Sequence, residues 1–178
     1  MIDERLEDRR RWYRIFEAGW DDPLDDTFAA EHGGRWNPPH SWRTLYLNED
    51  LVTARRNLDR FIAGWPYEPE DLDDDAGPHL AVATLPRDQL VADVYTPEGV
   101  AAVDLPLSYP VDEAGRLVSH HVCQRIGERV HAAGRRGVRC RSAQTPRGAG
   151  RELAWFPATA RSRARLVERR SFTAWFWG

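Results

Sequence analysis

Helical periodicity is confined to two long stretches of the chain, and this restricts the fold more than any other feature of the sequence. In residues 51–65 the apolar side chains recur at helical spacing, and Pro66 follows the pattern. Residues 119–133 show the same spacing and are followed by Gly134, a common helix stop. The sequence therefore predicts two main helices, and most of the remaining apolar residues must belong to another type of secondary structure.

Segments rich in β-branched and aromatic residues predict that this other structure is a sheet. The predicted strands cover residues 11–18, 44–47, 79–85, 89–94, 138–143, 152–156 and 164–177. Residues 27–43 are predicted to be irregular because glycine and proline pairs fix turns there, and a short helix is predicted from Thr96. Strands outnumber helices and do not alternate regularly with them, which favours an α+β fold over a doubly wound sheet.

A length of 178 residues fits one domain spanning 1–178, with the acidic, proline-containing stretch at about 66–78 as a solvated loop. Asp71 begins a calcium-loop spacing in this stretch, but Ala76 and Val82 replace the glycine and glutamate that such a loop requires. No apolar run approaches the roughly 20 residues of a membrane helix, and the first ten residues are too charged for a signal peptide. A cytoplasmic location without membrane association is therefore expected.

Metal binding is not expected. The two cysteines, Cys123 and Cys140, exclude a site with four cysteine ligands and are expected to be buried. On the second helix His120 and His121 point in different directions, and with His131 they form no convergent ligand set. Surface or capping roles are the better interpretation of these histidines.

The charges divide unevenly along the chain. Residues 1–115 contain 11 arginines against 25 acidic residues, whereas residues 116–178 contain 14 arginines against 3 glutamates. The basic third could face a nucleotide, a nucleic acid or an acidic partner, but the simpler interpretation is that it neutralises the acidic remainder within one fold. A nucleic-acid-binding module is kept as an alternative, although no helix-turn-helix pattern supports direct nucleic-acid binding.

The segment Gly33-Gly34-Arg35-Trp36-Asn37-Pro38-Pro39 has the character of a ligand-binding loop. Its two glycines let the backbone approach a ligand closely, and its prolines hold the loop in place. Arg35 would offer a rigid fork to phosphate or carboxylate, and Tyr46 on the next strand could present a ring for stacking. The alternative is that Arg35 is a surface charge and that Trp36 and Tyr46 are aromatic residues of the core.

The sequence resembles the RES domain family, whose members include toxins paired with Xre-type helix-turn-helix antitoxins. The matching stretches, in the order of the family, are Tyr13-Arg14, residues 33–39, residues 45–47, the helix from Leu51 and residues 137–143. The resemblance implies a single mixed-sheet α+β domain similar to ADP-ribosyltransferase toxins. It also implies that NAD⁺ is degraded as substrate, by phosphorolysis, hydrolysis or ADP-ribosyl transfer, and that an Xre-type antitoxin neutralises the protein.

The same resemblance implies the residues of the site. Arg14 and Arg35 would bind phosphate or ribose, Tyr46 would stack near nicotinamide, and Ser142 would line the pocket. The acidic position of the family falls on Asn57. The expected catalytic set is therefore Arg35, Tyr46, Asn57 and Ser142, with Arg14, Arg35, Tyr46 and Ser142 binding the nucleotide.

Asn57 is the main departure from the pattern of the family. A neutral amide keeps hydrogen bonding but loses the negative charge that would stabilise a cation formed as a glycosidic bond breaks. Asn57 sits about 80° from the centre of the apolar stripe on its helix, where a pocket-lining group belongs. A carboxylate at Glu49, Asp50 or Asp59 could substitute for the missing charge only if the pocket is reorganised. The alternative is a non-catalytic RES-like protein that retains nucleotide or partner binding.

Overall fold

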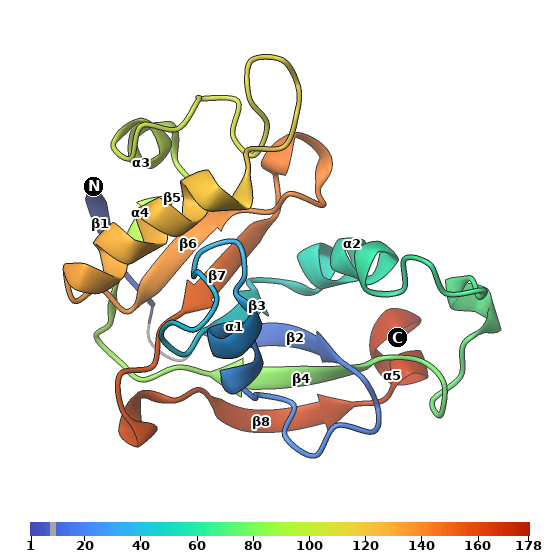
Figure 1. The fold of residues 1–178 in the computed structure, drawn as a ribbon. Coiled ribbons are helices and arrows are strands. Elements are labelled where there is room, and N and C mark those ends of the chain that lie inside the picture. The colour runs from blue at the N-terminus through green and yellow to red at the C-terminus, as the bar shows by residue number, and fades with distance from the viewer. Residues whose placement is uncertain (8–9) are drawn as a thin grey trace.

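A computed structural model describes residues 1–7 and 10–178 of the chain. Its eight strands form one sheet in the order β1-β5-β6-β7-β3-β2-β4-β8 (Figure 1). β5 and β6 pair in parallel, and the other neighbouring strands are antiparallel. The strands are β1 (Ile2–Arg5), β2 (Trp12–Phe16), β3 (Leu45–Asn48), β4 (His79–Thr84), β5 (Leu90–Val94), β6 (Gly137–Arg141), β7 (Arg151–Trp155) and β8 (Arg165–Arg170). The predicted α+β class with a single mixed sheet is confirmed.

Helices pack against the sheet at two places. α4 lies along β6, while α2 lies over β2 with α5 beside it (Figure 1). The helices of the described residues are α1 (Thr27–His32), α2 (Leu51–Phe61), α3 (Pro97–Ala101), α4 (His120–Ala132) and α5 (Phe172–Phe176), with short 3-10 turns at Pro69–Asp71, Pro146–Gly148 and Ala160–Ser162.

Both long helices form where the sequence predicts them, because each has a capping side chain and an apolar face. Asp50 accepts a hydrogen bond from the Thr53 amide (2.7 Å) at the start of α2, and Ser119 caps α4. α2 buries Leu58 completely. It ends at Phe61, four residues before the predicted end at 65, and a turn completes the segment.

Three segments differ from the sequence prediction. The strand predicted over 164–177 ends at Arg170, and α5 follows because Phe172 and Trp175, three residues apart, both enter the core. The charged N-terminus forms the edge strand β1, which pairs with β5. Residues 27–43, predicted to be irregular, begin with the six-residue helix α1. Because α1 has no buried residue, its sequence lacks the apolar periodicity that predicts a helix.

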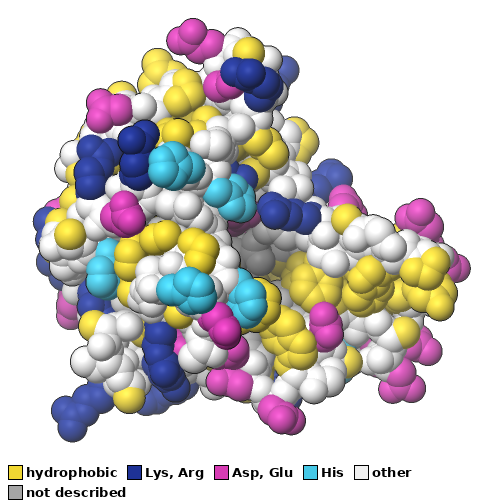
Figure 2. Space-filling model, viewed as in Figure 1, with side chains coloured by type: hydrophobic (Ala, Val, Ile, Leu, Met, Phe, Trp, Pro, Cys, Tyr) yellow, Lys and Arg dark blue, Asp and Glu magenta, His cyan; other side chains and the backbone are white. Residues whose placement is uncertain are grey.

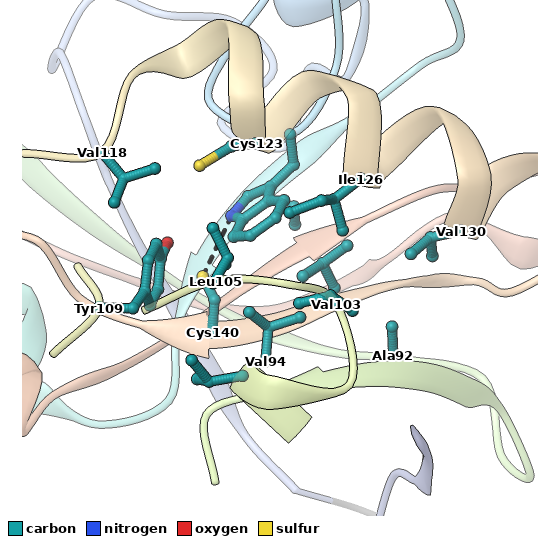
Figure 3. Packing of buried hydrophobic residues seen from close by; sticks show 14 of the residues in the cluster. Ala92, Val94, Val103, Leu105, Tyr109, Val118, Cys123, Ile126, Val130 and Cys140 are labelled. Atoms are coloured by element: carbon teal, nitrogen blue, oxygen red, sulfur yellow. Dashed lines mark hydrogen bonds between the residues drawn. The ribbon is translucent and has the colours of Figure 1, made fainter. Parts of the chain in front are cut away.

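The buried hydrophobic residues form three clusters, two of which lie beneath helices. Beneath α4, a cluster that includes Val94, Tyr109, Ile126 and Val130 fills the space against β5 and β6 (Figure 3). A second cluster lies beneath α2 and α5. Between these regions β2 and β3 share a single paired position, Tyr13 with Asn48, so the sheet is only weakly joined here. The sheet thus has two helix-covered parts, and where they meet a third cluster, which includes Trp12, Leu47 and Trp155, packs residues of β2, β3 and β7 together.

Charged residues far apart in sequence pair across one face of the sheet. Glu49 receives hydrogen bonds from Arg139 (2.7 Å) and Arg151 (3.1 Å). We call the group made by Glu4, Arg10, Glu49, Arg139 and Arg151 the Glu49 cluster. Because several arginines of the basic third pair with acids of the N-terminal part, the simpler interpretation of the charge division is supported.

The cysteines and His131 have structural roles. Cys123 and Cys140 are both buried thiols, as predicted, and His131 stacks on the Trp42 ring at 4.3 Å. Within residues 1–7 and 10–178 no group of three or more histidine, cysteine or acidic side chains could hold a metal ion. No helix in that part of the chain has the length and apolar character needed to cross a membrane.

Candidate functional site

A cavity of about 460 Å³ opens where the two parts of the sheet meet. Figure 2 shows a hollow at the centre of this face, with basic and histidine side chains above it and hydrophobic side chains to its right. The charged and polar side chains that line the cavity are Arg14, Arg35, Thr44, Tyr46, Asn57, Arg60, His120, Gln144 and Glu152. Phe28 and Phe61 are among its apolar lining residues. Four of the five residues proposed for the site from sequence, all except Ser142, therefore meet in one cavity.

The glycine-rich loop of residues 33–39 forms one wall. Gly33 has a φ of +77°, which glycine adopts without strain. A Cβ on Gly34 would collide with the Tyr46 ring, so the missing side chain lets the loop lie directly on that ring. The Trp36 side chain anchors the loop in the core through a hydrogen bond from its indole to Cys140 Sγ (3.2 Å), the dashed line in Figure 3.

Tyr46 on β3 holds this loop from below. Its hydroxyl accepts a hydrogen bond from the Trp36 amide (2.9 Å) and donates one to Asn37 Oδ1 (2.8 Å). Burial raises the pKa of Tyr46 well above its ordinary value, so the phenol stays protonated at neutral pH. Tyr46 can thus present its ring to a ligand, while its hydroxyl is occupied in positioning the loop.

Three arginines give the cavity a positive charge. Arg14 donates to the Asp25 carbonyl (2.7 Å), and Arg35 donates to the Val118 carbonyl (3.1 Å). Arg60 lies on the last turn of α2 and is exposed. Among the described residues none of the three forms an ion pair with a carboxylate. A guanidinium has five donor hydrogens, so each arginine keeps donors for an anionic ligand.

Glu152 supplies the carboxylate of the cavity. The β3–β7 register places it opposite Asn48, and directly opposed residues of antiparallel strands share a face. From α2, Asn57 donates one hydrogen bond to Asn48 Oδ1 (2.5 Å) and another to Glu152 Oε1 (2.9 Å). Asn57 lies at the edge of the helix stripe, as predicted, and there it holds a neighbouring carboxylate in place.

The other sequence-based candidates occupy different places. Ser142 is fully buried and accepts a hydrogen bond from the Gln144 amide (3.2 Å), so it lies beneath the cavity wall instead of lining the cavity. Glu49 is held in the Glu49 cluster, and Asp50 caps α2. Asp59 is exposed and is not a lining residue. None of the three proposed acidic substitutes therefore provides a carboxylate to the cavity.

Sequence reasoning missed Glu152, Arg60 and His120 as lining residues. A glutamate at the start of a predicted strand carries no signal of which face it will occupy or which strand it will oppose. Arg60 has one usable signal, since it lies three residues after Asn57 and such residues are neighbours on a helix. His120 was assigned a surface or capping role; it is exposed, but it also faces the cavity.

The arrangement suits an anionic ligand that also contains an electron-poor centre. Three guanidinium groups can bind phosphate oxygens, the Tyr46 ring and the phenylalanines can contact a flat ring, and Glu152 can accept hydrogen bonds or stabilise positive charge. The only acidic residue in the described lining is Glu152. With three arginines and one glutamate, the lining keeps a net positive charge, and its negative charge is confined to one position.

Comparison with known proteins identifies the family and the fold. The family model for the RES domain matches residues 11–176. Among solved structures, the chain is similar to one from the crystal structure of the M. tuberculosis MbcT–MbcA toxin–antitoxin complex, with a TM-score of 0.72 and 22% identity over 95% of this chain and 90% of that chain. No curated protein matches the sequence. The match to the family model covers most of the sequence, and the chain belongs to the RES domain family.

Proposed function

We propose that the protein is an enzyme that degrades NAD⁺ by breaking the bond between nicotinamide and ribose. The observation that carries the proposal is the meeting of three arginines with one carboxylate, Glu152, in a single cavity. NAD⁺ has matching chemistry, because it joins a diphosphate to a ribose that bears a cationic nicotinamide ring. Membership of the RES domain family also supports an activity on NAD⁺.

In this proposal the arginines hold the diphosphate. Arg14 and Arg35 are each fixed by one backbone carbonyl and keep further donors free. Arg60 adds a third positive charge from the opposite element, α2. Tyr46, whose ring lines the cavity beside the glycine-rich loop, would stack on the nicotinamide ring.

Glu152 would act on the ribose. As the glycosidic bond breaks, positive charge develops on the sugar carbon and ring oxygen, and a fixed carboxylate stabilises that charge. Asn57 orients the carboxylate through its hydrogen bond to Oε1. The neutral residue at the family's acidic position is therefore compatible with catalysis, because the charge comes from β7 and not from α2.

The test is turnover of NAD⁺ by purified protein, with products identified in the presence and absence of phosphate. We expect Glu152→Gln to slow turnover by roughly 10²–10³-fold with little change in NAD⁺ affinity, as for loss of a group that stabilises mainly the transition state. The control is Glu128→Gln, which changes an exposed glutamate of α4 outside the cavity. NAD⁺ binding by the wild-type protein without turnover would support the non-catalytic alternative, and absence of binding would refute the proposal.

We further propose that the protein is the toxin of a toxin–antitoxin pair with an Xre-type helix-turn-helix antitoxin. The support is family membership together with the likeness to a chain from a toxin–antitoxin complex. An acidic segment of the antitoxin would cover the arginine-lined cavity and prevent NAD⁺ entry. Copurification with the product of a neighbouring gene, and recovery of NAD⁺ degradation when salt separates the two proteins, would test this.

A further inference from the structure

His120 is the imidazole of the described cavity lining, the type of side chain that exchanges a proton near neutral pH. Arg14, Arg35 and Arg60 remain cationic, and the amides of Asn57 and Gln144 do not titrate. Burial keeps Tyr46 protonated. Of the described lining residues, this leaves Glu152, whose Oε1 is bound by Asn57, and His120.

The start of α4 fixes His120 at the cavity. Ser119 caps the helix, Arg35 donates to the Val118 carbonyl (3.1 Å), and one turn later Gln124 donates to the Gly34 carbonyl (2.9 Å). These contacts tie both sides of His120 to the glycine-rich loop. His120 is itself exposed, so its ring can meet both a ligand in the cavity and water from outside.

The surroundings keep this imidazole in its proton-accepting form. Partial burial lowers the pKa of His120 below the ordinary 6.5, and the positive charges of Arg35 and Arg60 lower it further. Glu152 and Tyr46 are the other titratable side chains of the same lining. At neutral pH His120 is therefore uncharged and has a free nitrogen lone pair.

We propose that His120 accepts the proton of the attacking nucleophile, and that the nucleophile is water. This inference rests on the proposed function and specifies its reaction as hydrolysis. The bond between C1′ and the nicotinamide nitrogen breaks, and its electron pair leaves with nicotinamide, which becomes neutral. The water oxygen bonds to C1′, its proton passes to the His120 ring and then to solvent, and the products are ADP-ribose and nicotinamide. A phosphate dianion would need no such base, since it can attack without losing a proton.

The test compares pH profiles of NAD⁺ turnover for the wild-type protein and His120→Gln, with His121→Gln as the matched control. His121 is the next residue of α4, is exposed and does not line the cavity. We expect wild-type activity to fall as pH drops through a midpoint below 6.5, because protonation removes the base. His120→Gln should lower the rate at pH 7.5 by about 10²–10⁴-fold, lose that step in the profile and keep its NAD⁺ affinity. His121→Gln should match the wild type.

Three results would separate the possible failures. If His120→Gln retains both the wild-type rate and the acidic step, the inference is overturned while NAD⁺ degradation stands. If turnover depends on added phosphate and yields a phosphorylated ADP-ribose, water is not the nucleophile and the inference is again overturned. If the wild-type protein does not degrade NAD⁺ at any pH, the proposed function fails and the inference fails with it.

Discussion

The Glu49 cluster and the cavity both contain arginines and carboxylates, and each includes one of two adjacent residues of β7. Arg151 and Glu152 are neighbours on β7, and alternate residues of a strand point to opposite faces of the sheet. Arg151 joins the Glu49 cluster, in which Glu49 is almost fully buried with 7% of its side chain exposed. Glu152 turns to the cavity, where its partner is the neutral amide of Asn57.

The two groups differ in how their charges are satisfied. In the Glu49 cluster the carboxylate of Glu49 contacts three guanidiniums, and Arg139 also reaches Glu4. In the cavity the three arginines and Glu152 form no ion pairs within the part of the chain that the structure describes, and Glu152 is instead bound by the amide of Asn57. The same residue types thus form a network of ion pairs on one face of the sheet and a cavity with donors available for an anionic ligand on the other. The two groups therefore differ in whether their charged side chains form ion pairs, and not in the types of residue that they contain.

The largest expected effect comes from breaking the network of ion pairs. Glu49→Gln removes the negative charge that three arginines share, of which Arg139 is the most buried, and should lower the free energy of unfolding by about 3–5 kcal/mol. For a chain of this size the melting temperature should fall by on the order of 10 °C. Denaturant unfolding measures the loss, and turnover per folded molecule should be unchanged. The control, Glu168→Gln, removes an exposed partner of Arg170 and should leave stability unchanged.

Adding a second carboxylate to the cavity is expected to have an intermediate effect. Asn57→Glu would remove the amide that holds Glu152 and would place a second negative charge beside it. We expect roughly tenfold or greater loss of NAD⁺ turnover, the reverse of what a carboxylate restored to the family's acidic position would give. Turnover kinetics and a thermal melt measure the two effects separately.

A double variant makes this prediction sharper. Asn57→Glu combined with Glu152→Asn returns the pair to one amide and one carboxylate with their positions exchanged. Part of the lost activity should return, which would show strong coupling between the two positions. A double variant whose losses simply add would show that the two side chains act independently.

The smallest effect is expected at the exposed rim of the cavity. Arg60→Ala should raise the KM for NAD⁺ about three- to tenfold with kcat unchanged, because an exposed arginine contributes mainly binding that water and salt screen. Arg56→Ala is the matched control, since Arg56 lies one turn earlier on α2, is exposed and does not line the cavity. The difference between the variants should shrink at high ionic strength. Equal effects of both would remove Arg60 from the site.

Several features were predictable from sequence because their signals are local. Helical periodicity with capping residues located α2 and α4 to within a few residues. Residue types at short spacing predict that the glycine-rich loop and Tyr46 form a site, and the structure brings the two into direct contact. Asn57 was placed at the edge of its helix by angle alone, which is where it lies.

Tertiary structure decided the features that depend on which strands pair and in what register. Glu152 faces the cavity because β7 pairs with β3 so that Glu152 opposes Asn48, and a shift of one residue would send Arg151 there instead. Ser142 is buried within its own turn, where it accepts a hydrogen bond from the Gln144 amide. His120 lies at the cavity because α4 packs over β6 beside the glycine-rich loop. Spacing along a chain determines which face of its own element a side chain occupies, whereas the partner that face meets is set by contacts between residues distant in sequence. The local elements and the binding loop therefore follow from the sequence, and the carboxylate and the histidine of the cavity follow only from the fold.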